Sequence, residues 1–104
     1  MAFYNSCRDV QLDGSTLTAN CQDSNGYWGS WSSIDLNQYI GNREGYFDTS
    51  IERFYETARN VYLTGSVLHA SMQDSYQYYQ DEQTIDLNLF ITNDNGQLKF
   101  KQYM

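Results

Sequence analysis

The chain repeats itself at an offset of 51 positions, without a gap, across nearly its whole length. Chance does not give so many matches at one offset, so we interpret the chain as two copies of one unit, residues 1–51 and residues 52–104. Two copies predict a pseudo-two-fold molecule in which any binding site can occur twice. The identical pairs include Phe3/Phe54, Arg8/Arg59, Leu17/Leu68, Ala19/Ala70, Asp23/Asp74, Ile34/Ile85, Asn37/Asn88, Ile40/Ile91, Asn42/Asn93 and Gly45/Gly96.

Each unit is expected to be mostly β. Apolar and polar residues alternate over 17–21, which is typical of a strand with one face toward the core and one toward solvent. Gly14 separates this stretch from an earlier apolar one, a pattern that favours a hairpin. In residues 33–37 and 84–88, a Ser or Thr cap followed by Ile and Leu indicates a short helical turn. Gly45 then turns the chain into a short final strand.

The repeat bears on the two cysteines. Cys7 and Cys21 occupy the positions of Ala58 and Met72 in the second copy, and both replacements are apolar. These positions are therefore expected to face each other or the core. The cysteines form either a disulfide, which would close a loop of about 15 residues and stabilise the fold by roughly 3 kcal/mol, or two buried thiols.

Charge and hydropathy exclude several partners. The net charge is −7, from 6 basic and 13 acidic residues. An acidic surface repels phosphate groups, so we expect no nucleic-acid partner and no binding to anionic membranes. The sequence has no apolar run long enough for a transmembrane helix and no secretory signal pattern at its start, so membrane insertion is not expected and the compartment stays open.

Catalytic and metal-binding patterns are missing from the sequence. His69 is the only histidine, on the outward side of an expected strand, and no catalytic triad or zinc cluster can be assembled around it. Residues 93–96 resemble the middle of a calcium loop, but Ile91 and Gln102 stand where the loop needs acids. Asp81 and Glu82 are adjacent carboxylates without room for a glycosidase cleft. We therefore expect no enzyme, no cofactor and no metal.

The remaining polar residues suit sugar recognition. The chain contains ten tyrosines and many Asn, Gln, Ser, Thr and Asp residues, whose side chains can pair with sugar hydroxyls. Each such hydrogen bond contributes only about 1 kcal/mol in water, so sugar-binding proteins often repeat their sites. On composition alone, a polar β-protein without a ligand, a protein-interaction module and a calcium-binding β-domain remain open.

Specific stretches carry a family resemblance. Residues 7–12 (CRDVQL), 14–17 (GSTL) and 32–37 (SSIDLN) in the first copy resemble the cyanovirin-N homologue family of lectins. The second copy adds residues 85–88 (IDLN) and 95–100 (NGQLKF). The resemblance covers nearly the whole chain and implies a mostly β, pseudo-two-fold tandem repeat. Each half would be a three-stranded sheet plus a β-hairpin, with short helical turns between them.

The resemblance also implies that the two halves exchange chain. Structural domain A would comprise about residues 1–39 plus 91–104, and domain B about residues 40–90. Residues 49–53 resemble the family's hinge, through which members can swap halves, so the chain is expected as a monomer or a domain-swapped dimer. The proline of that hinge is absent here.

The function that the resemblance implies is binding of mannose-rich glycans or glycoproteins, with a preference for terminal α1,2-linked mannose. The alternative is a protein-interaction or structural module on the same fold that does not bind sugar. Carried over by position, the domain A site takes Ala2, Asn5, Ser6, Gln22, Ser24, Asn93, Asp94 and Asn95. The domain B site takes Gly41, Asn42, Arg43, Glu44, Arg53, Glu56, Thr57, Gln73, Asp74, Ser75 and Gln77.

The chain departs from the family pattern in three ways. A second disulfide is missing, with Ala58 and Met72 in its place. Residues 73–75 replace the basic residues usual near the domain B site, and Gly41 replaces a carboxylate. The loops also carry extra aromatic side chains, among them Trp28 and Trp31, of which we expect one to stack on a sugar and the other to cap the core.

Overall fold

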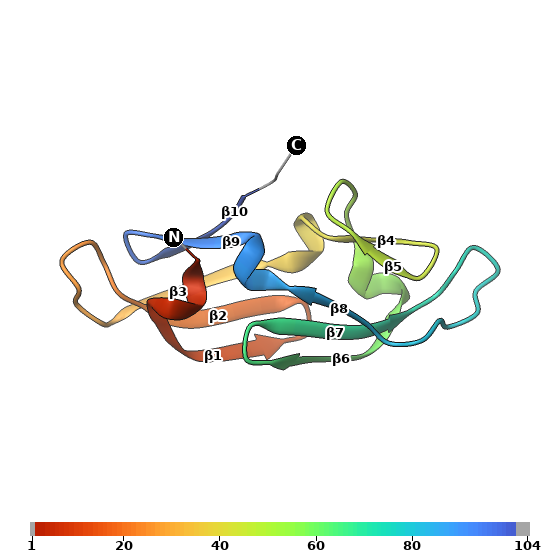
Figure 1. Ribbon diagram of the computed structural model, residues 1–104, viewed down its shortest axis with the longest axis horizontal. Helices are drawn as coiled ribbons and strands as arrows, with labels where there is room; N and C mark the ends of the chain where they lie inside the picture. Colours follow the sequence, from red (N-terminus) through yellow and green to blue (C-terminus); the bar gives the residue numbers. More distant parts are fainter. Residues whose placement is uncertain (1, 102–104) are drawn as a thin grey trace.

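Two three-stranded antiparallel sheets lie along the long axis of the molecule (Figure 1). The computed structural model describes residues 2–101. Both sheets run in sequence order, so each sequence copy builds its own sheet. The first contains β1 (Cys7–Asp13), β2 (Thr16–Cys21) and β3 (Ser30–Asp35), and the second contains β6 (Ala58–Thr64), β7 (Val67–Met72) and β8 (Gln83–Asp86).

Two hairpins and four single-turn 3₁₀ helices complete the fold. Among the described residues, no helix is long and apolar enough to cross a membrane. The molecule is elongated, with principal extents of 49 × 27 × 16 Å. The hairpins are β4 (Gly41–Arg43) with β5 (Tyr46–Asp48) and β9 (Ile91–Asp94) with β10 (Gln97–Phe100); the helices are η1 (Phe3–Asn5), η2 (Leu36–Gln38), η3 (Phe54–Thr57) and η4 (Leu87–Leu89).

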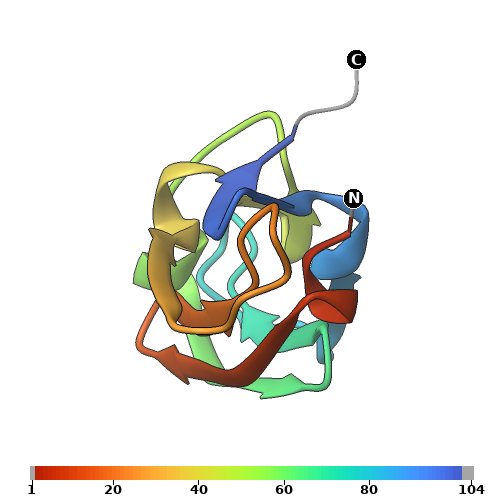
Figure 2. The same cartoon turned by 90° about the vertical axis from the view of Figure 1, so that its left-hand side faces the viewer.

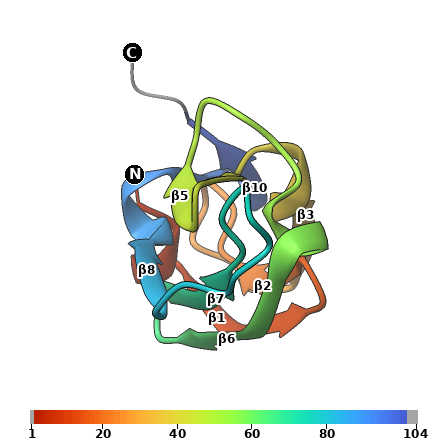
Figure 3. The same cartoon turned by 90° about the vertical axis from the view of Figure 1, so that its right-hand side faces the viewer.

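Each hairpin packs against the sheet of the other sequence copy. Strand β10 lies beside β3, where the Leu98 N–H donates to Ser32 Oγ at 3.0 Å, and β5 lies beside β8. Figure 2 shows the β9–β10 hairpin over the end of the first sheet, and Figure 3 shows β5 above β8 at the opposite end. The mostly β tandem repeat, with a sheet, a hairpin and short helical turns in each half, is therefore confirmed.

The core repeats with the chain. Leu17 and Ala19 are fully buried on the inner face of β2, and Leu68 and Ala70 on β7, as the alternation predicts. Burying a side chain of leucine size contributes about 1.5–3 kcal/mol. The largest fully buried side chains include the offset pairs Phe3/Phe54, Leu17/Leu68, Leu36/Leu87 and Ile40/Ile91.

The helical turns occur where they were expected, but their caps differ from the expectation. Ser33 belongs to β3, and the N-cap of η2 is Asp35, whose Oδ1 accepts the Asn37 N–H at 3.0 Å. Asp86 caps η4 in the same way. The same Asp35 Oδ1 also accepts a hydrogen bond from the Ser15 hydroxyl, in the turn of the preceding hairpin, at 2.7 Å. The strand therefore continues to the aspartate, which joins sheet to turn.

Cys7 and Cys21 form a disulfide bond. Of the two alternatives left open by the sequence, the disulfide is therefore confirmed and the pair of buried thiols is wrong. The two residues are directly opposite in the β1–β2 ladder. Ala58 and Met72 face each other at the same place in β6 and β7, and Met72 is fully buried. The second copy thus fills by packing the space that the first copy closes covalently.

The outward side of β7 is less exposed than expected at His69. Its ring stacks on Tyr62 with centroids 4.3 Å apart, and its side chain is 17% exposed. Glu82 Oε2 lies 3.1 Å from His69 Nδ1 and accepts from the Tyr62 hydroxyl at 3.2 Å. The hydrogen bond to Glu82 raises the pKa of Tyr62. The histidine is therefore a covered member of a side-chain cluster.

Candidate functional site

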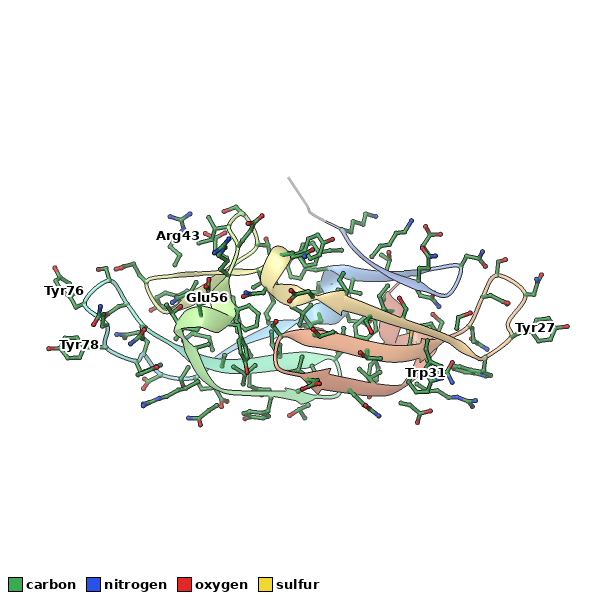
Figure 4. The ribbon with its side chains drawn as sticks, turned by 180° about the vertical axis from the view of Figure 1, so that it is seen from behind. Tyr27, Trp31, Arg43, Glu56, Tyr76 and Tyr78 are labelled. Atoms are coloured by element: carbon green, nitrogen blue, oxygen red, sulfur yellow. A yellow bond between two sulfur atoms is a disulfide. The ribbon has the colours of Figure 1, made fainter. Side chains whose placement is uncertain are left out.

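Two clusters of the expected site residues form at opposite ends of the molecule. Each is built from a 3₁₀ turn, the loop between the second and third strands of a sheet, and the turn of a hairpin. In Figure 4, Glu56 and Arg43 mark one end, which we call end B, and Tyr27 lies at the other, which we call end A. The chain exchange brings residues far apart in sequence together at both ends.

At end B, Asn42 ties three segments together. Its Nδ2 donates to Thr57 Oγ1 at 2.8 Å and to the Gln73 carbonyl at 2.7 Å. Its Oδ1 accepts the Gly45 N–H at 2.8 Å. Both N–H groups of the amide are therefore used within the protein, and Asn42 holds its neighbours in place.

Asn93 does the same at end A. Its Nδ2 donates to Ser6 Oγ at 2.8 Å and to the Gln22 carbonyl at 2.9 Å, and its Oδ1 accepts the Gly96 N–H at 2.7 Å. This pattern matches that of Asn42 bond for bond. Asn42 and Asn93 therefore hold the same three segments together at the two ends.

A second contact fastens each sheet loop to its hairpin turn. At end B the carboxylate oxygens of Glu44 accept the Ser75 N–H at 3.2 and 3.1 Å. At end A the Asn95 Oδ1 accepts the Ser24 N–H at 2.8 Å. The hydroxyls of the exposed serines remain at the mouth of each cluster, on backbone that is held in place.

Asp74 shapes the loop rather than facing outward. Its Oδ1 accepts the N–H groups of Tyr76 and Tyr78 at 2.9 and 3.1 Å, and its Oδ2 accepts from Gln80 Nε2 at 2.7 Å. Asp23 makes the equivalent backbone bonds at end A. Our sequence reasoning omitted Asp23, although its identity with Asp74 at offset 51 was a usable signal.

End B contains an open pocket of about 320 Å³. Most of its lining residues were expected from the sequence, and Glu52 was missed. Its signal was its place beside Arg53 at the junction of the two copies. The lining residues are Asn42, Glu44, Glu52, Arg53, Thr57, Gln73, Asp74 and Ser75.

Four expected residues of end B do not line this pocket: Gly41, Gln77, Glu56 and Arg43. Gly41 is buried, because it pairs with Arg53 in a β-bridge and packs under Ile51. Gln77 has a left-handed backbone (φ 70°), and its carbonyl accepts from Gln73 Nε2 at 3.2 Å. Glu56 is exposed beside the pocket, 3.8 Å from the Arg53 guanidinium. Glu56 therefore lies at the rim, paired with a lining residue.

Arg43 points to the outer edge of the hairpin. Its Nε donates to Asp48 Oδ2 at 2.5 Å. A hydrogen bond from the Ser50 hydroxyl, and then the one from Arg43, lower the pKa of Asp48 from its usual 3.8 to about 2. The guanidinium is thus engaged on the side of the hairpin, outside the pocket lining.

The two ends differ in charge. Glu44, Arg53 and Glu56 at end B correspond to Asn95, Ala2 and Asn5 at end A. Ala2 forms an isolated bridge to the β9–β10 hairpin, Asn5 is exposed, and Asp94 pairs with Lys99 at 2.9 Å. End A is therefore the more neutral of two clusters that share one scaffold. Within residues 2–101, no group of three His, Cys, Asp or Glu side chains is placed to hold a metal ion.

The expectation that one tryptophan caps the core is wrong. Trp28 is 39% exposed and Trp31 is 57% exposed. The inner face of the first sheet is closed by the β9–β10 hairpin, so the loop that carries Trp28 stays outside. Both rings are surface features.

The whole described architecture matches one family. Residues 3–99 match the model of the CVNH domain. The chain belongs to the CVNH family. It is 31% identical to the cyanovirin-N homolog of Tuber borchii, over 97% of this chain and 100% of that protein. The solved structure of the T. borchii CVNH superposes with a TM-score of 0.84.

Two further CVNH-like structures hold sugars. The microvirin–mannobiose complex is 25% identical, covers 96% of this chain and 99% of its own, and gives a TM-score of 0.82. The MoCVNH3 variant Mo0v in complex with (N-GlcNAc)4 is 25% identical, covers 94% and 95% of the two chains, and gives a TM-score of 0.84. Proteins of the CVNH fold that resemble this chain therefore bind carbohydrate.

Proposed function

We propose that this CVNH protein is a lectin for mannose-rich glycans, binding terminal α1,2-linked mannose at shallow sites at one or both ends. The polar, open pocket at end B supports this most directly. Its fixed carboxylates and hydroxyls match the hydroxyl-rich edge of a sugar, and its modest size of about 320 Å³ suits one or two terminal rings. The mannobiose complex of microvirin adds weight to the choice of mannose. The proposal involves binding without catalysis.

At end B the side chains at the pocket mouth would make the direct contacts. Glu44 and Glu56 are exposed acceptors for sugar hydroxyls, and Arg53 is an exposed donor. The remaining members proposed for this site hold the turn and loop in place or lie at the rim: Gly41, Asn42, Arg43, Thr57, Gln73, Asp74, Ser75 and Gln77.

At end A the same scaffold would present neutral groups. Asn5, Ser24 and the backbone of residues 93–95 would contact the sugar, while Asn93 positions the turn. Weak single sites at two ends would gain avidity on a branched glycan. The full set proposed for this site is Ala2, Asn5, Ser6, Gln22, Ser24, Asn93, Asp94 and Asn95.

The proposed sites follow a division in which domain A comprises residues 1–39 plus 91–104 and domain B residues 40–90. The hydrogen bond of Leu98 to Ser32 and the packing of β5 beside β8 support this division, since they join each hairpin to the other copy's sheet. The molecule would work as a monomer or as a dimer swapped through residues 49–53.

An oligomer of N-acetylglucosamine is a second candidate ligand. The complex of Mo0v with (N-GlcNAc)4 favours it, because that protein shares this chain's fold at 25% identity. An acetamido group would accept from the exposed Arg53 or from backbone N–H groups. Binding of this oligomer without binding of mannobiose would replace the mannose proposal.

Titration with α1,2-mannobiose, followed by amide NMR, tests the function. We expect shifts confined to residues 2–6, 22–24 and 93–95, or to residues 41–44, 53–57 and 73–77. Shifts at neither set at millimolar sugar would exclude the mannose function. A parallel titration with (N-GlcNAc)4 separates the two candidate ligands.

Two matched variants assign the ends. Glu56→Ala and Asn5→Ala remove equivalent exposed side chains, one from each copy. Each is expected to weaken mannobiose binding at its own end and to leave the other end's shifts unchanged. Loss of binding at both ends from one variant would contradict two independent sites.

A further inference from the structure

A row of three side chains crosses the outer face of the first sheet. Arg8 pairs directly with Asn20, and Asn20 pairs directly with Trp31. Directly opposed residues of antiparallel strands project to the same face. The neighbours of Asn20 on β2, Ala19 and Cys21, are fully buried on the inner face, so the row faces outward. In Figure 4, Trp31 lies on the side of β3 away from the β9–β10 hairpin.

Asn20 is buried although it faces outward. It is 7% exposed, and it is the one polar residue among the buried ones within residues 2–101. The loop before β3 folds back over it, because the Gly29 N–H donates to Asn20 Oδ1 at 2.7 Å. An outward-facing polar residue that is fixed by such a hydrogen bond can form the floor of a binding site on the surface.

The Asn20 amide nitrogen has no acceptor among the described residues. The bond from Gly29 fixes Oδ1, and therefore leaves Nδ2 with both of its hydrogens to donate. No fully sealed side-chain nitrogen or oxygen in residues 2–101 lacks a partner, so Nδ2 still reaches solvent. A residue that is more than nine-tenths buried, with a solvent-accessible donor that no protein group accepts from, indicates a place where a ligand's acceptor atom binds.

Arg8 supplies a cation at the same place. One face of its guanidinium lies 4.2 Å from the centroid of the Trp28 ring, which fixes its plane. Within the described chain, no carboxylate forms an ion pair with it. The N–H groups at the edge of the guanidinium are therefore available to a ligand.

Trp31 provides an apolar platform beside these donors. Its ring is 57% exposed, and its Cβ is expected about 5 Å from that of Asn20 across the ladder. The hydroxyls farther along this face, Thr18 and Ser33, bond to each other at 2.9 Å. The groups left for a ligand are thus two kinds of donor, one of them cationic, and an exposed aromatic face.

We propose that Arg8, Asn20 and Trp31 form a further binding site, on the outer face of the first sheet, for an acidic sugar. The pyranose ring stacks on Trp31, and its carboxylate accepts from Asn20 Nδ2 and from the Arg8 guanidinium. A neutral hexose would satisfy the stacking and leave the cation without a partner. This site does not depend on the mannose proposal, since none of its three residues is in the set proposed for either end. Trp31 also lines a pocket with Asn95 of end A, so the site lies next to that end.

The second copy lacks this site. Arg59 also lies over an aromatic ring, with Tyr79 at 3.9 Å, but Ser71 and Glu82 replace Asn20 and Trp31. A carboxylate at the position of the platform repels an anion. The molecule therefore contains its own negative control, with the cation–aromatic pair kept and the other two groups changed.

The test compares methyl β-D-glucuronide with methyl β-D-glucoside, which differ by the carboxylate. We expect the glucuronide to shift the NMR signals of the Asn20 side-chain amide and of the Trp31 indole N–H. The glucoside is expected to bind at least about tenfold more weakly. Equal affinity for the two ligands would overturn the acidic-sugar assignment. Absence of shifts at both groups would overturn the site, even if α1,2-mannobiose binds at the ends.

Variants locate the effect. Asn20→Asp keeps an acceptor for Gly29 and removes the donor, and Trp31→Ala removes an exposed ring; each is expected to weaken glucuronide binding about tenfold. Tyr79→Ala, which removes the ring beneath Arg59 in the second copy, is expected to leave it unchanged. Trp31→Ala keeps the test valid if Asn20→Asp fails to fold. Unchanged affinity in Trp31→Ala, or an equal loss in Tyr79→Ala, would refute the proposal.

Discussion

Asn93 Nδ2 donates a 2.8 Å hydrogen bond to Ser6 Oγ, joining residues 87 positions apart in the chain. Asn42 makes the same bond to Thr57 Oγ1 at the other end, also at 2.8 Å. In each case the donor lies in a hairpin and the acceptor at the end of a 3₁₀ turn from the other copy. The pair therefore links the exchanged segments, and the proposed sites are built around it.

Replacing either asparagine should destabilise the protein as well as its binding. Asn93→Ala or Asn42→Ala is expected to lower the free energy of unfolding by about 1–3 kcal/mol, because half-buried partners lose their hydrogen bonds. Urea unfolding measures the loss, and Asn5→Ala, an exposed change, should stay within about 0.5 kcal/mol of the wild type. If Asn93→Ala kept full stability and lost sugar binding, Asn93 would instead contact the sugar directly.

Gly41→Ala should disturb end B through the backbone. A Cβ at this position would lie 2.3 Å from Ile51 Cγ1 and 2.8 Å from the carbonyl oxygen of Glu52. Relieving such overlap in packed structure costs about 1–3 kcal/mol, and the shift would move residues 52–53 at the pocket rim. The equivalent position at end A holds Thr92, so Thr92→Ala is the matched control. Thermal melting of both variants checks the difference.

Reduction of the Cys7–Cys21 bond should lower stability without abolishing the fold. The bonded residues are 14 positions apart, and a loop of that length is worth about 3 kcal/mol on the chain-entropy model. The second copy folds the same way with Ala58 opposite Met72, so packing alone suffices there. Melting with and without reductant measures the effect. Identical melting temperatures would show that the bond contributes no stability.

Stability should fall in acid partly through Asp48. Its pKa in the fold, about 2, lies below the usual 3.8, so the native state binds the proton less readily than the unfolded chain. The carboxylate's contribution is therefore complete above about pH 4 and disappears as the pH falls toward 2. Wild type should be more stable than Asp48→Asn at pH 6, and the gap should close near pH 2. A gap that is constant from pH 6 to pH 2 would contradict the shifted pKa.

Much of the fold could be predicted from the sequence. The offset of 51 gave two equivalent units, and the alternation at residues 17–21 gave the buried face of β2. The turn at residues 33–37 was located, but its cap was misassigned, because Ser33 and Asp35 are both good cap residues. The choice between them depends on where the strand ends, which is set by pairing with β2 rather than by local preference.

The residues around the proposed sites were found more readily than their roles. The family resemblance brought Asn42, Thr57 and Gln73 into one group, and the pocket at end B contains all three. The sequence could not show that both amide hydrogens of Asn42 are donated within the protein, since the donor and its acceptors lie in different copies. Trp28 and Trp31 illustrate the same limit, because a ring's burial depends on which hairpin closes the sheet above it.

By itself the sequence determined the duplication, the strand periodicity and the apolar positions, because these follow from spacing along one chain. Only the tertiary structure decided that each hairpin packs on the other copy's sheet and that Asn42 and Asn93 are positioning residues. It also decided that Arg8, Asn20 and Trp31 stand in one row, with an amide donor left free. Such contacts depend on strand register and chain exchange, which join residues whose separation in sequence carries no information about their neighbours.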